Sequence, residues 1–189
     1  SNICTAQALL ANVAAAYGVY HGPDGIIKIA ERVHKYAKLL SYGLCEKLGC
    51  VENVNDVYFD TLTLKVNPKI IETALPILDK GYQRGINFRP IDGELLSISL
   101  DETTSLQDIT EILQVFAQAM HLNARDKTST GQRLNAYDLL AEMEDVKVIP
   151  DSLRRTSKFM QHETFNTHHS ETSLMRYLYQ LERKDLGLN

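Results

Sequence analysis

Hydrophobic residues recur with a helical period over the first fifty positions. Residues 3–20 are apolar and rich in alanine, which predicts a packed helix that another element can approach closely. The sequence His21-Gly-Pro-Asp-Gly25 interrupts this pattern. From Ile26 to Leu44 apolar residues return at three- and four-residue steps. This spacing predicts an amphipathic helix of about five turns, which Gly49 ends.

Strand and helix patterns follow one another between residues 57 and 81. We expect a strand within 57–66, where the apolar alternation changes phase at Asp60-Thr61. The strand therefore contains a bulge or begins late. Asn67-Pro68 is typical of a helix start, so a helix is predicted from Pro68 to Gly81. Pro76 lies inside that helix and should kink or break it.

The segment 86–100 has the alternation of a β-hairpin around a turn at 90–93. Asn87 and Arg89 share the polar face of its first strand, and the serines of its second strand alternate with Leu96, Ile98 and Leu100. Ser105-Leu-Gln-Asp108 resembles a capping box, and it opens a helix with an apolar stripe from Leu106 to Met120. The order β-α-β-β-α predicts an α/β (α+β) fold with a small, mostly antiparallel sheet covered by helices.

The last third of the chain is more polar. Residues 122–134 predict a loop, 137–144 a short helix, and 149–157 a loop or a helical turn. Ser170 is a natural N-cap for a final helix, whose apolar stripe consists of Leu174, Tyr177, Leu178 and Leu181.

Composition narrows the possible functions. Hydrophobic residues make up 44% and charged residues 23%, which is ordinary for a globular protein. A net charge of −4 without a basic run argues against a nucleic-acid partner. Residues 3–20 lack a basic leader and are short for a membrane span, so no membrane partner is expected. Three cysteines are too few for a disulfide framework.

Polar clusters offer several kinds of chemistry. His162, His168, His169 and Glu171 do not have the spacing of a zinc helix, so a hydrogen-bonded loop is favoured over a metal site. Ser170 beside histidine lacks the Gly-x-Ser-x-Gly turn of a hydrolase nucleophile. Arg154 and Arg155 suit either an anion or a salt bridge, and these alternatives stay open. Asn87 and Arg89 either meet a substrate or another domain, or form a solvated face.

Longer sequence strings carry a family resemblance. They are Ser1-Asn-Ile-Cys-Thr-Ala-Gln7, Phe59-Asp-Thr-Leu62, Ile86-Asn-Phe-Arg89, Ser97-Ile-Ser-Leu-Asp-Glu-Thr103, Arg155-Thr-Ser157, Phe165-Asn-Thr-His-His-Ser-Glu-Thr172, Met175-Arg-Tyr177 and Leu181-Glu-x-Lys-Asp-Leu186. In order and spacing these strings resemble the glycine cleavage system P proteins. The resemblance covers residues 1–189 and is weakest at 121–148. Ser173 and Lys158 depart from the family pattern, which usually has Glu and Pro there.

The resemblance implies a fold, a cofactor and partners. P proteins are pyridoxal phosphate enzymes of the aspartate-aminotransferase fold type, built from two homologous halves with the cofactor lysine in the C-terminal half. This chain resembles the last part of the N-terminal half. It implies that residues 1–50 are a helical segment from the end of the large domain with a linker helix. Residues 51–189 are then the small α/β domain with a C-terminal extension.

The resemblance also sets the expected site. We expect a truncated chain that is inactive alone, with no catalytic residue, no metal and no bound cofactor. Its partners are the C-terminal half of the enzyme and the lipoyl-bearing H protein. Residues at the rim of the active site or the interface between halves are expected to be His168, His169, Ser170, Glu171, Thr172, Arg176, Asn87, Arg89 and Arg155.

Two alternatives remain open from the sequence. The chain is either part of such an enzyme or an independent binding or regulatory module with the same small-domain fold. In the first case the alanine-rich face of residues 3–20 is exposed or used in a homodimer, and in the second it is covered by the chain itself. The expected compartment is the bacterial cytoplasm, or the mitochondrial matrix for a eukaryotic source.

Overall fold

The computed structural model describes residues 4–123, 134–143 and 149–187. The chain divides into two compact units, of which one is Glu31–Asp151 and the other combines Ser1–Ala30 with Ser152–Asn189. This division differs from the predicted one at residue 50. Residues 31–50 belong with the sheet, because Leu40 and Leu44 are fully buried in its core.

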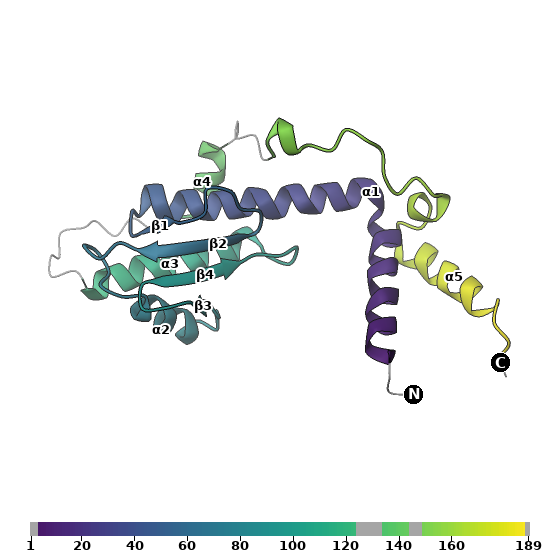
Figure 1. Ribbon diagram of the computed structural model, residues 1–189, viewed down its shortest axis with the longest axis horizontal. Helices are drawn as coiled ribbons and strands as arrows, with labels where there is room; N and C mark the ends of the chain where they lie inside the picture. Colours follow the sequence, from purple (N-terminus) through teal and green to yellow (C-terminus); the bar gives the residue numbers. More distant parts are fainter. Residues whose placement is uncertain (1–3, 124–133, 144–148, 188–189) are drawn as a thin grey trace. The chain divides into compact units, whose positions relative to one another are not determined.

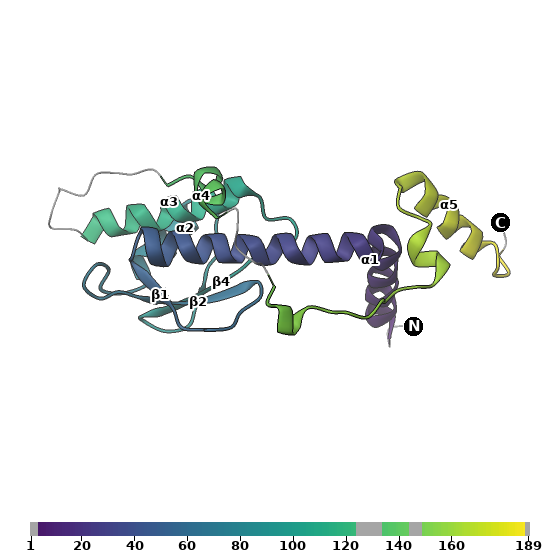
Figure 2. The same cartoon turned by 90° about the horizontal axis from the view of Figure 1, so that it is seen from above.

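The unit Glu31–Asp151 is built on a four-stranded antiparallel sheet. Its strands are β1 (Val51–Asn53), β2 (Thr61–Val66), β3 (Arg89–Pro90) and β4 (Leu95–Ser99), in the spatial order β1-β2-β4-β3. Helices α2 (Leu75–Gln83), α3 (Leu106–Asn123) and α4 (Ala136–Glu142) belong to the same unit, with the second part of α1 (Thr5–Ser41) and the π-helix η1 (Tyr42–Lys47). These helices lie on one face of the sheet (Figures 1 and 2). The predicted antiparallel sheet covered by helices is confirmed.

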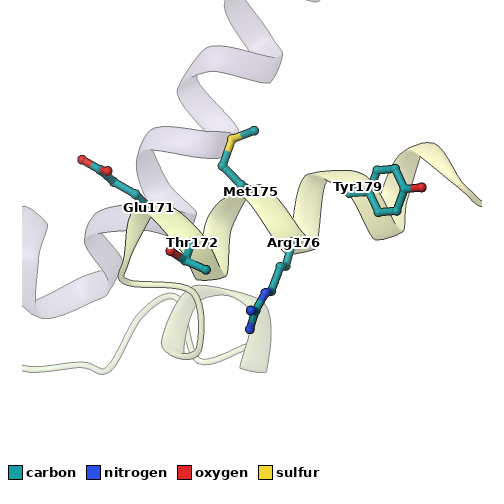
Figure 3. Close-up of a pocket in the computed structure, with 5 residues that line it drawn as sticks. All are labelled: Glu171, Thr172, Met175, Arg176 and Tyr179. Atoms are coloured by element: carbon teal, nitrogen blue, oxygen red, sulfur yellow. The ribbon is translucent and has the colours of Figure 1, made fainter.

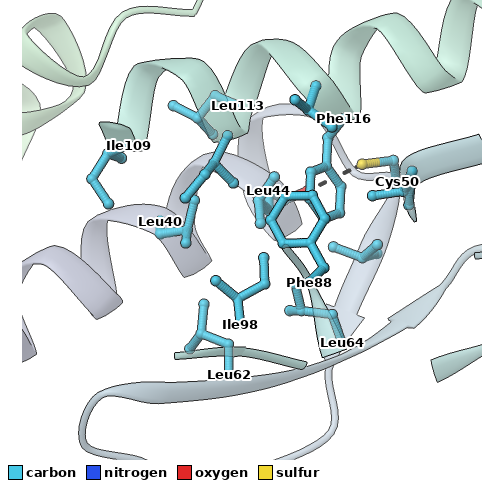
Figure 4. Packing of buried hydrophobic residues seen from close by; sticks show 14 of the residues in the cluster. Leu40, Leu44, Cys50, Leu62, Leu64, Phe88, Ile98, Ile109, Leu113 and Phe116 are labelled. Atoms are coloured by element: carbon cyan, nitrogen blue, oxygen red, sulfur yellow. Dashed lines mark hydrogen bonds between the residues drawn. The ribbon is translucent and has the colours of Figure 1, made fainter. Parts of the chain in front are cut away.

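The core lies between this sheet and its helices. Leu62 and Leu64 of β2 point inward and are fully buried, while Thr61, Thr63 and Lys65, which alternate with them, are half-buried. Phe88 and Phe116 meet edge to face, with ring centroids 5.8 Å apart (Figure 4). The alternation of β2 begins at Thr61, so the late start of this strand is confirmed.

The predicted helix start at Pro68 is wrong, because α2 begins at Leu75. The Asn67 side chain accepts the N–H of Lys69 at 3.1 Å, which makes a local turn rather than a helix cap. The N–H of Ala74 donates to the carbonyl of Gly93 at 2.9 Å, which ties this segment to the loop before β4. Pro76 then lies in the first turn of α2, where the missing N–H costs nothing.

Two smaller differences concern the predicted hairpin. Its first strand shrinks to Arg89–Pro90, although Phe88 is buried and Asn87 and Arg89 are exposed as predicted. Ser97 is buried rather than solvated, because β4 lies in the interior of the sheet between β2 and β3. Strand β1 was not predicted. The loop at 122–134 falls mostly outside the described residues.

Helix α3 starts as the capping box predicts. The carboxylate of Asp108 accepts both the backbone N–H and the hydroxyl of Ser105, at 2.7 and 2.6 Å, and the Ser105 Oγ accepts the N–H of Asp108 at 3.2 Å. These bonds hold the pKa of the Asp108 carboxyl below its usual value, with the Ser105 hydroxyl as the main cause. The cap fixes the first turn of the helix that carries Leu113 and Phe116 into the core.

The second unit contains the start of helix α1 (Thr5–Ser41), the 3₁₀ turn η3 (Glu163–Asn166) and helix α5 (Glu171–Glu182). Another 3₁₀ turn, η2 (Asp151–Leu153), spans the boundary of the two units. Helix α1 loses helical geometry at Gly22, whose φ and ψ are 62° and 179°. The predicted interruption at 21–25 is therefore confirmed. The short helix and the turn predicted in the last third are confirmed as α4 and η2, within the described residues.

Candidate functional site

The N-terminus of α5 gathers most of the predicted polar residues. The Ser170 Oγ accepts the N–H of Ser173 at 3.3 Å and caps the helix, as predicted. Glu171 follows in the first turn, where a carboxylate interacts favourably with the positive end of the helix dipole. The sequence Ser170-Glu-Thr-Ser173 lacks the Glu of a capping box at its fourth position, so Ser173 is available for another partner.

That partner is His168. Its Nδ1 lies 3.1 Å from the Ser173 Oγ, and its ring stacks on Tyr177 with centroids 4.4 Å apart and planes 18° apart. Stacking on one turn and hydrogen bonding to the turn before it hold the imidazole against the side of α5. His168 is therefore held against the helix that follows it in the sequence.

His169 points instead to the interruption of α1. Its Nδ1 lies 2.9 Å from the carbonyl oxygen of Tyr20. A carbonyl oxygen only accepts, so Nδ1 carries the proton and Nε2 of the neutral ring is an acceptor. In an uninterrupted helix the Tyr20 carbonyl would accept a hydrogen bond from the N–H of residue 24. The irregular backbone at Gly22 interrupts this helical hydrogen-bond pattern.

Gly22 is required at this contact. A Cβ at Gly22 would lie 2.5 Å from Cε1 of His169 and 2.8 Å from the carbonyl oxygen of Phe165. Its φ of 62° with extended ψ also belongs to a region that side-chain-bearing residues avoid. The interruption of α1 and the His-His sequence are thus two parts of one local structure.

The exposed side of α5 forms an open hollow of about 460 Å³, lined by Glu171, Thr172, Met175, Arg176 and Tyr179. Their side chains project from the helix, with Glu171 and Met175 to one side and Thr172 and Arg176 to the other (Figure 3). The exposed surface of α5 therefore presents a carboxylate, a guanidinium, a thioether and a phenol. Met, Arg and Tyr are the residues that protein interfaces favour.

The other predicted residues lie elsewhere. The Nη1 of Arg155 donates to the Ser157 Oγ at 3.2 Å, and its guanidinium lies over the Phe159 ring at 5.3 Å. It belongs to the same unit as α5. Asn87 and Arg89 are exposed in the sheet-containing unit. The structure therefore assembles His168 to Arg176 at one helix start and leaves the remaining three as separate surface residues.

Sequence reasoning missed Met175 and Tyr179. Together with Glu171 they follow a spacing of four residues, which places them on one helical face. This face lies beside the apolar stripe that contains Leu174 and Tyr177. The four-residue spacing could therefore have been recognised in the sequence. The contact between His169 and Tyr20 had no such signal, because 149 positions separate the two residues.

The structure restricts the possible chemistry. Within residues 4–123, 134–143 and 149–187, no group of three or more His, Cys, Asp or Glu side chains is arranged to hold a metal ion. Among the helices of these same segments, none is long and apolar enough to cross a membrane. What remains is an α+β chain whose polar residues gather at a helix start beside an open hollow.

Comparison with known proteins defines the family. The family model described as glycine cleavage system P-protein matches residues 1–116. The chain is 44% identical over its whole length to a glycine dehydrogenase (decarboxylating) of Photobacterium profundum, of which it covers 18%. It is 41% identical to the mitochondrial glycine dehydrogenase (decarboxylating) of Solanum tuberosum, covering 16% of it. It is 45% identical to that of Deinococcus radiodurans, covering 17%.

This chain belongs to the glycine cleavage system P-protein family. In each of the three relatives the match takes in the whole of this chain but less than a fifth of the relative.

Proposed function

We propose that these residues are part of a glycine dehydrogenase (decarboxylating), the oxidoreductase called the P protein of the glycine cleavage system. The observation that carries this proposal is the similarity of the entire chain to proteins of that name. The complete enzyme would decarboxylate glycine with pyridoxal phosphate and pass the aminomethyl group to the lipoyl group of H protein. The exposed residues 4–15 of α1 support this proposal over an independent module, which would cover them itself.

The described residues do not fit a Schiff-base site for pyridoxal phosphate. Such a site needs a lysine in a desolvated pocket, so that its amine is nucleophilic. The buried polar side chains of the described residues are His34, Ser97 and Thr110, and each lysine among them is at least partly exposed. We place the cofactor lysine in the C-terminal half of the enzyme and derive no chemical step for the residues of this chain.

We propose a contact role for this chain in the enzyme. The sheet-containing unit is the small domain of an aspartate-aminotransferase fold type, and α1 leads into it from the large domain. His168, His169, Ser170, Glu171, Thr172 and Arg176 would lie at the rim of the active site or at the interface between halves. Asn87, Arg89 and Arg155 are further candidates on the surface. The observation behind this role is the open hollow on α5 with its interface-type side chains.

Activity of the full-length gene product tests the enzyme assignment. We expect release of labelled carbon dioxide from carboxyl-labelled glycine when pyridoxal phosphate and lipoylated H protein are present. The 189-residue chain alone should release none and should show no visible aldimine absorbance after titration with pyridoxal phosphate. A lysine-bound aldimine on this chain would contradict its assignment to the half without the cofactor lysine.

Alanine substitutions in the full-length enzyme test the α5 surface. Arg176→Ala should lower turnover or H-protein affinity at least about tenfold, since a hydrogen bond to a charged group contributes roughly 1.5–3 kcal/mol. Gln180→Ala, on an exposed position of the same helix, is the matched control. If His168→Ala, His169→Ala and Arg176→Ala all leave both quantities unchanged, the cluster only stabilises the fold.

Two expectations stay predictions. The compartment is the bacterial cytoplasm, or the mitochondrial matrix if the source is eukaryotic. A homodimer of the isolated chain through residues 3–20 is one way to cover the exposed start of α1.

A further inference from the structure

Two arginines precede an exposed serine in the segment between η2 and η3. The sequence Arg154-Arg155-Thr156-Ser157 contains the one pair of adjacent arginines in the chain. All four residues are exposed, and residues 154–162 form neither a helix nor a strand. An exposed segment of irregular backbone can enter the cleft of a modifying enzyme without unfolding a helix or a strand. Ser157 therefore combines an accessible hydroxyl with arginines two and three positions before it.

The charge of this segment differs from that of the whole chain. Residues 152–162 carry three positive charges, at Arg154, Arg155 and Lys158, and no acidic residue, whereas the net charge of the chain is −4. The two salt bridges that the structure describes both lie in the sheet-containing unit. No described carboxylate therefore forms an ion pair with these three side chains. Of the two roles that the sequence left open for the arginines, binding of an anion is the one that fits the described residues.

The guanidinium of Arg155 already lies beside the hydroxyl of Ser157. Its Nη1 donates to the Ser157 Oγ at 3.2 Å, and its Cζ lies 5.3 Å from the centroid of the Phe159 ring. A guanidinium only donates, so the hydroxyl accepts here and its own proton stays available for transfer. Arginine binds phosphate through two parallel hydrogen bonds. A phosphate on the Ser157 oxygen would therefore find its partner in place.

The neighbouring hydroxyls lack this arrangement. Ser152 is exposed in the same segment, but Pro150 and Asp151 precede it in place of arginines. Thr156 is exposed as well, but its hydroxyl is on a branched carbon and the arginines lie one and two positions before it. Protein kinases distinguish their substrates by such charge patterns. The pattern of basic residues thus selects Ser157 among the hydroxyls of this segment.

We propose that Ser157 is a phosphorylation site for a protein kinase that selects arginines two and three positions before its acceptor. The Ser157 oxygen attacks the γ-phosphorus of a nucleoside triphosphate that the kinase holds. The new O–P bond forms as the bond to the bridging β-phosphate oxygen breaks, the nucleoside diphosphate leaves, and the hydroxyl proton passes to a base of the kinase. The phosphoserine carries a charge of about −1.5 to −2 and pairs with Arg155.

Phosphorylation would change a side chain that the proposed function assigns to a contact. Arg155 is one of the surface candidates for the interface between halves, and a phosphate on Ser157 would hold its guanidinium and neutralise most of the positive charge around it. The modification is thus a means of weakening that contact. The inference rests on the proposed function only in this consequence, because the phosphorylation itself requires no more than an accessible segment.

Phosphorylation of the full-length gene product, measured peptide by peptide, tests the site. The probe is the catalytic subunit of cyclic-AMP-dependent protein kinase, which selects such arginine pairs, with labelled ATP. We expect label on Ser157 and none on Ser152. Arg154→Ala and Arg155→Ala should each lower the rate at least about tenfold, since each removes a charge-assisted hydrogen bond to the kinase. Arg183→Ala is the matched control, because that guanidinium also lies over an aromatic ring, at 5.6 Å, and it should leave the rate unchanged.

Absence of label on Ser157 in the full-length protein would overturn the proposal, because the segment would then be covered. Label that is insensitive to both arginine substitutions would overturn it as well.

Mass spectrometry of the full-length protein isolated from its own cells shows whether the modification occurs there. Peptides made with a protease that does not cleave at arginine should carry phosphate on Ser157, and detection of that peptide in the unmodified form alone would contradict the proposal. Trypsin should cleave the phosphorylated protein after Arg155 at least about tenfold more slowly than after phosphatase treatment, since the phosphate holds the guanidinium. Equal rates would refute the pairing. These measurements need no turnover, so an inactive protein that is phosphorylated on Ser157 would refute the proposed function alone.

Discussion

Gly22 shows how one residue joins two distant segments. Replacing it with alanine would force a Cβ to within 2.5 Å of His169 and 2.8 Å of the Phe165 carbonyl. The backbone conformation alone costs a side-chain-bearing residue roughly 1–3 kcal/mol. We therefore expect Gly22→Ala to lower the free energy of unfolding by at least that amount, measured by urea denaturation. Exchange of amides near His169 should rise as well.

Gly18→Ala is the matched control for this substitution. It lies one turn earlier on the same helix and also faces Phe165, and its new Cβ would make ordinary contacts at 3.5 Å or more. Alanine is favoured over glycine in a helix by about 1 kcal/mol, so Gly18→Ala should stabilise or be neutral. If Gly22→Ala behaves like Gly18→Ala, the interruption of α1 does not depend on glycine.

At the scale of elements, Thr110 joins α3 to α4. Its Oγ1 donates to the Leu106 carbonyl at 2.9 Å and accepts the N–H of Ala136, which is fully buried, at 3.0 Å. Thr110→Val keeps the shape but leaves that N–H without an acceptor, which costs roughly 1–3 kcal/mol. We expect this loss in the free energy of unfolding, and a smaller loss for Thr110→Ser, which keeps the hydroxyl. Equal values for the two variants would show that the bond contributes nothing.

The elements also show what the sequence could and could not predict. The helices α1 and α3 were predictable because their apolar period is long, and because Gly22 marks the interruption of one and the Ser105 cap the start of the other. Strand β1 was missed because three residues carry too little alternation to recognise. The start of α2 was misplaced because the bond from Ala74 to Gly93 depends on a loop 19 positions away. Ser97 was misassigned because its burial depends on the order of the strands.

The same limit applied to the candidate site. The helix cap at Ser170 and the neighbouring polar residues followed from local sequence rules. The role of His169 did not, because its partner Tyr20 comes from the other end of the chain. Local pattern thus located the polar cluster at the start of α5, and only the tertiary structure separated His169, which bonds to α1, from the residues that line the hollow.

At the scale of the whole molecule, the three cysteines report on folding. Cys4 is exposed, Cys45 is half-buried, and Cys50 is fully buried in the core. Burial raises the pKa of the Cys45 thiol, and it raises the pKa of Cys50 to about 12. Because the thiolate is the reactive form, Cys50 stays protonated and unreactive up to strongly alkaline pH.

Alkylation followed by peptide mass spectrometry measures this difference. In the native chain near pH 8 we expect Cys4 to react first, Cys45 more slowly and Cys50 only when the sheet-containing unit opens. Phe116→Ala removes a fully buried ring and costs about 3–5 kcal/mol, so it should speed the labelling of Cys50 and leave that of Cys4 unchanged. Labelling of native Cys50 as fast as Cys4 would show that the core does not protect it.

The bond between His169 and Tyr20 also sets an order of events during synthesis. Residue 169 leaves the ribosome 149 residues after Tyr20, which takes roughly 7–30 s at about 5–20 residues per second. Residues 31–151 are complete before that and can fold as a unit in the interval. Their folding replaces a flexible stretch of chain with a compact unit, which shortens the loop that remains to be closed.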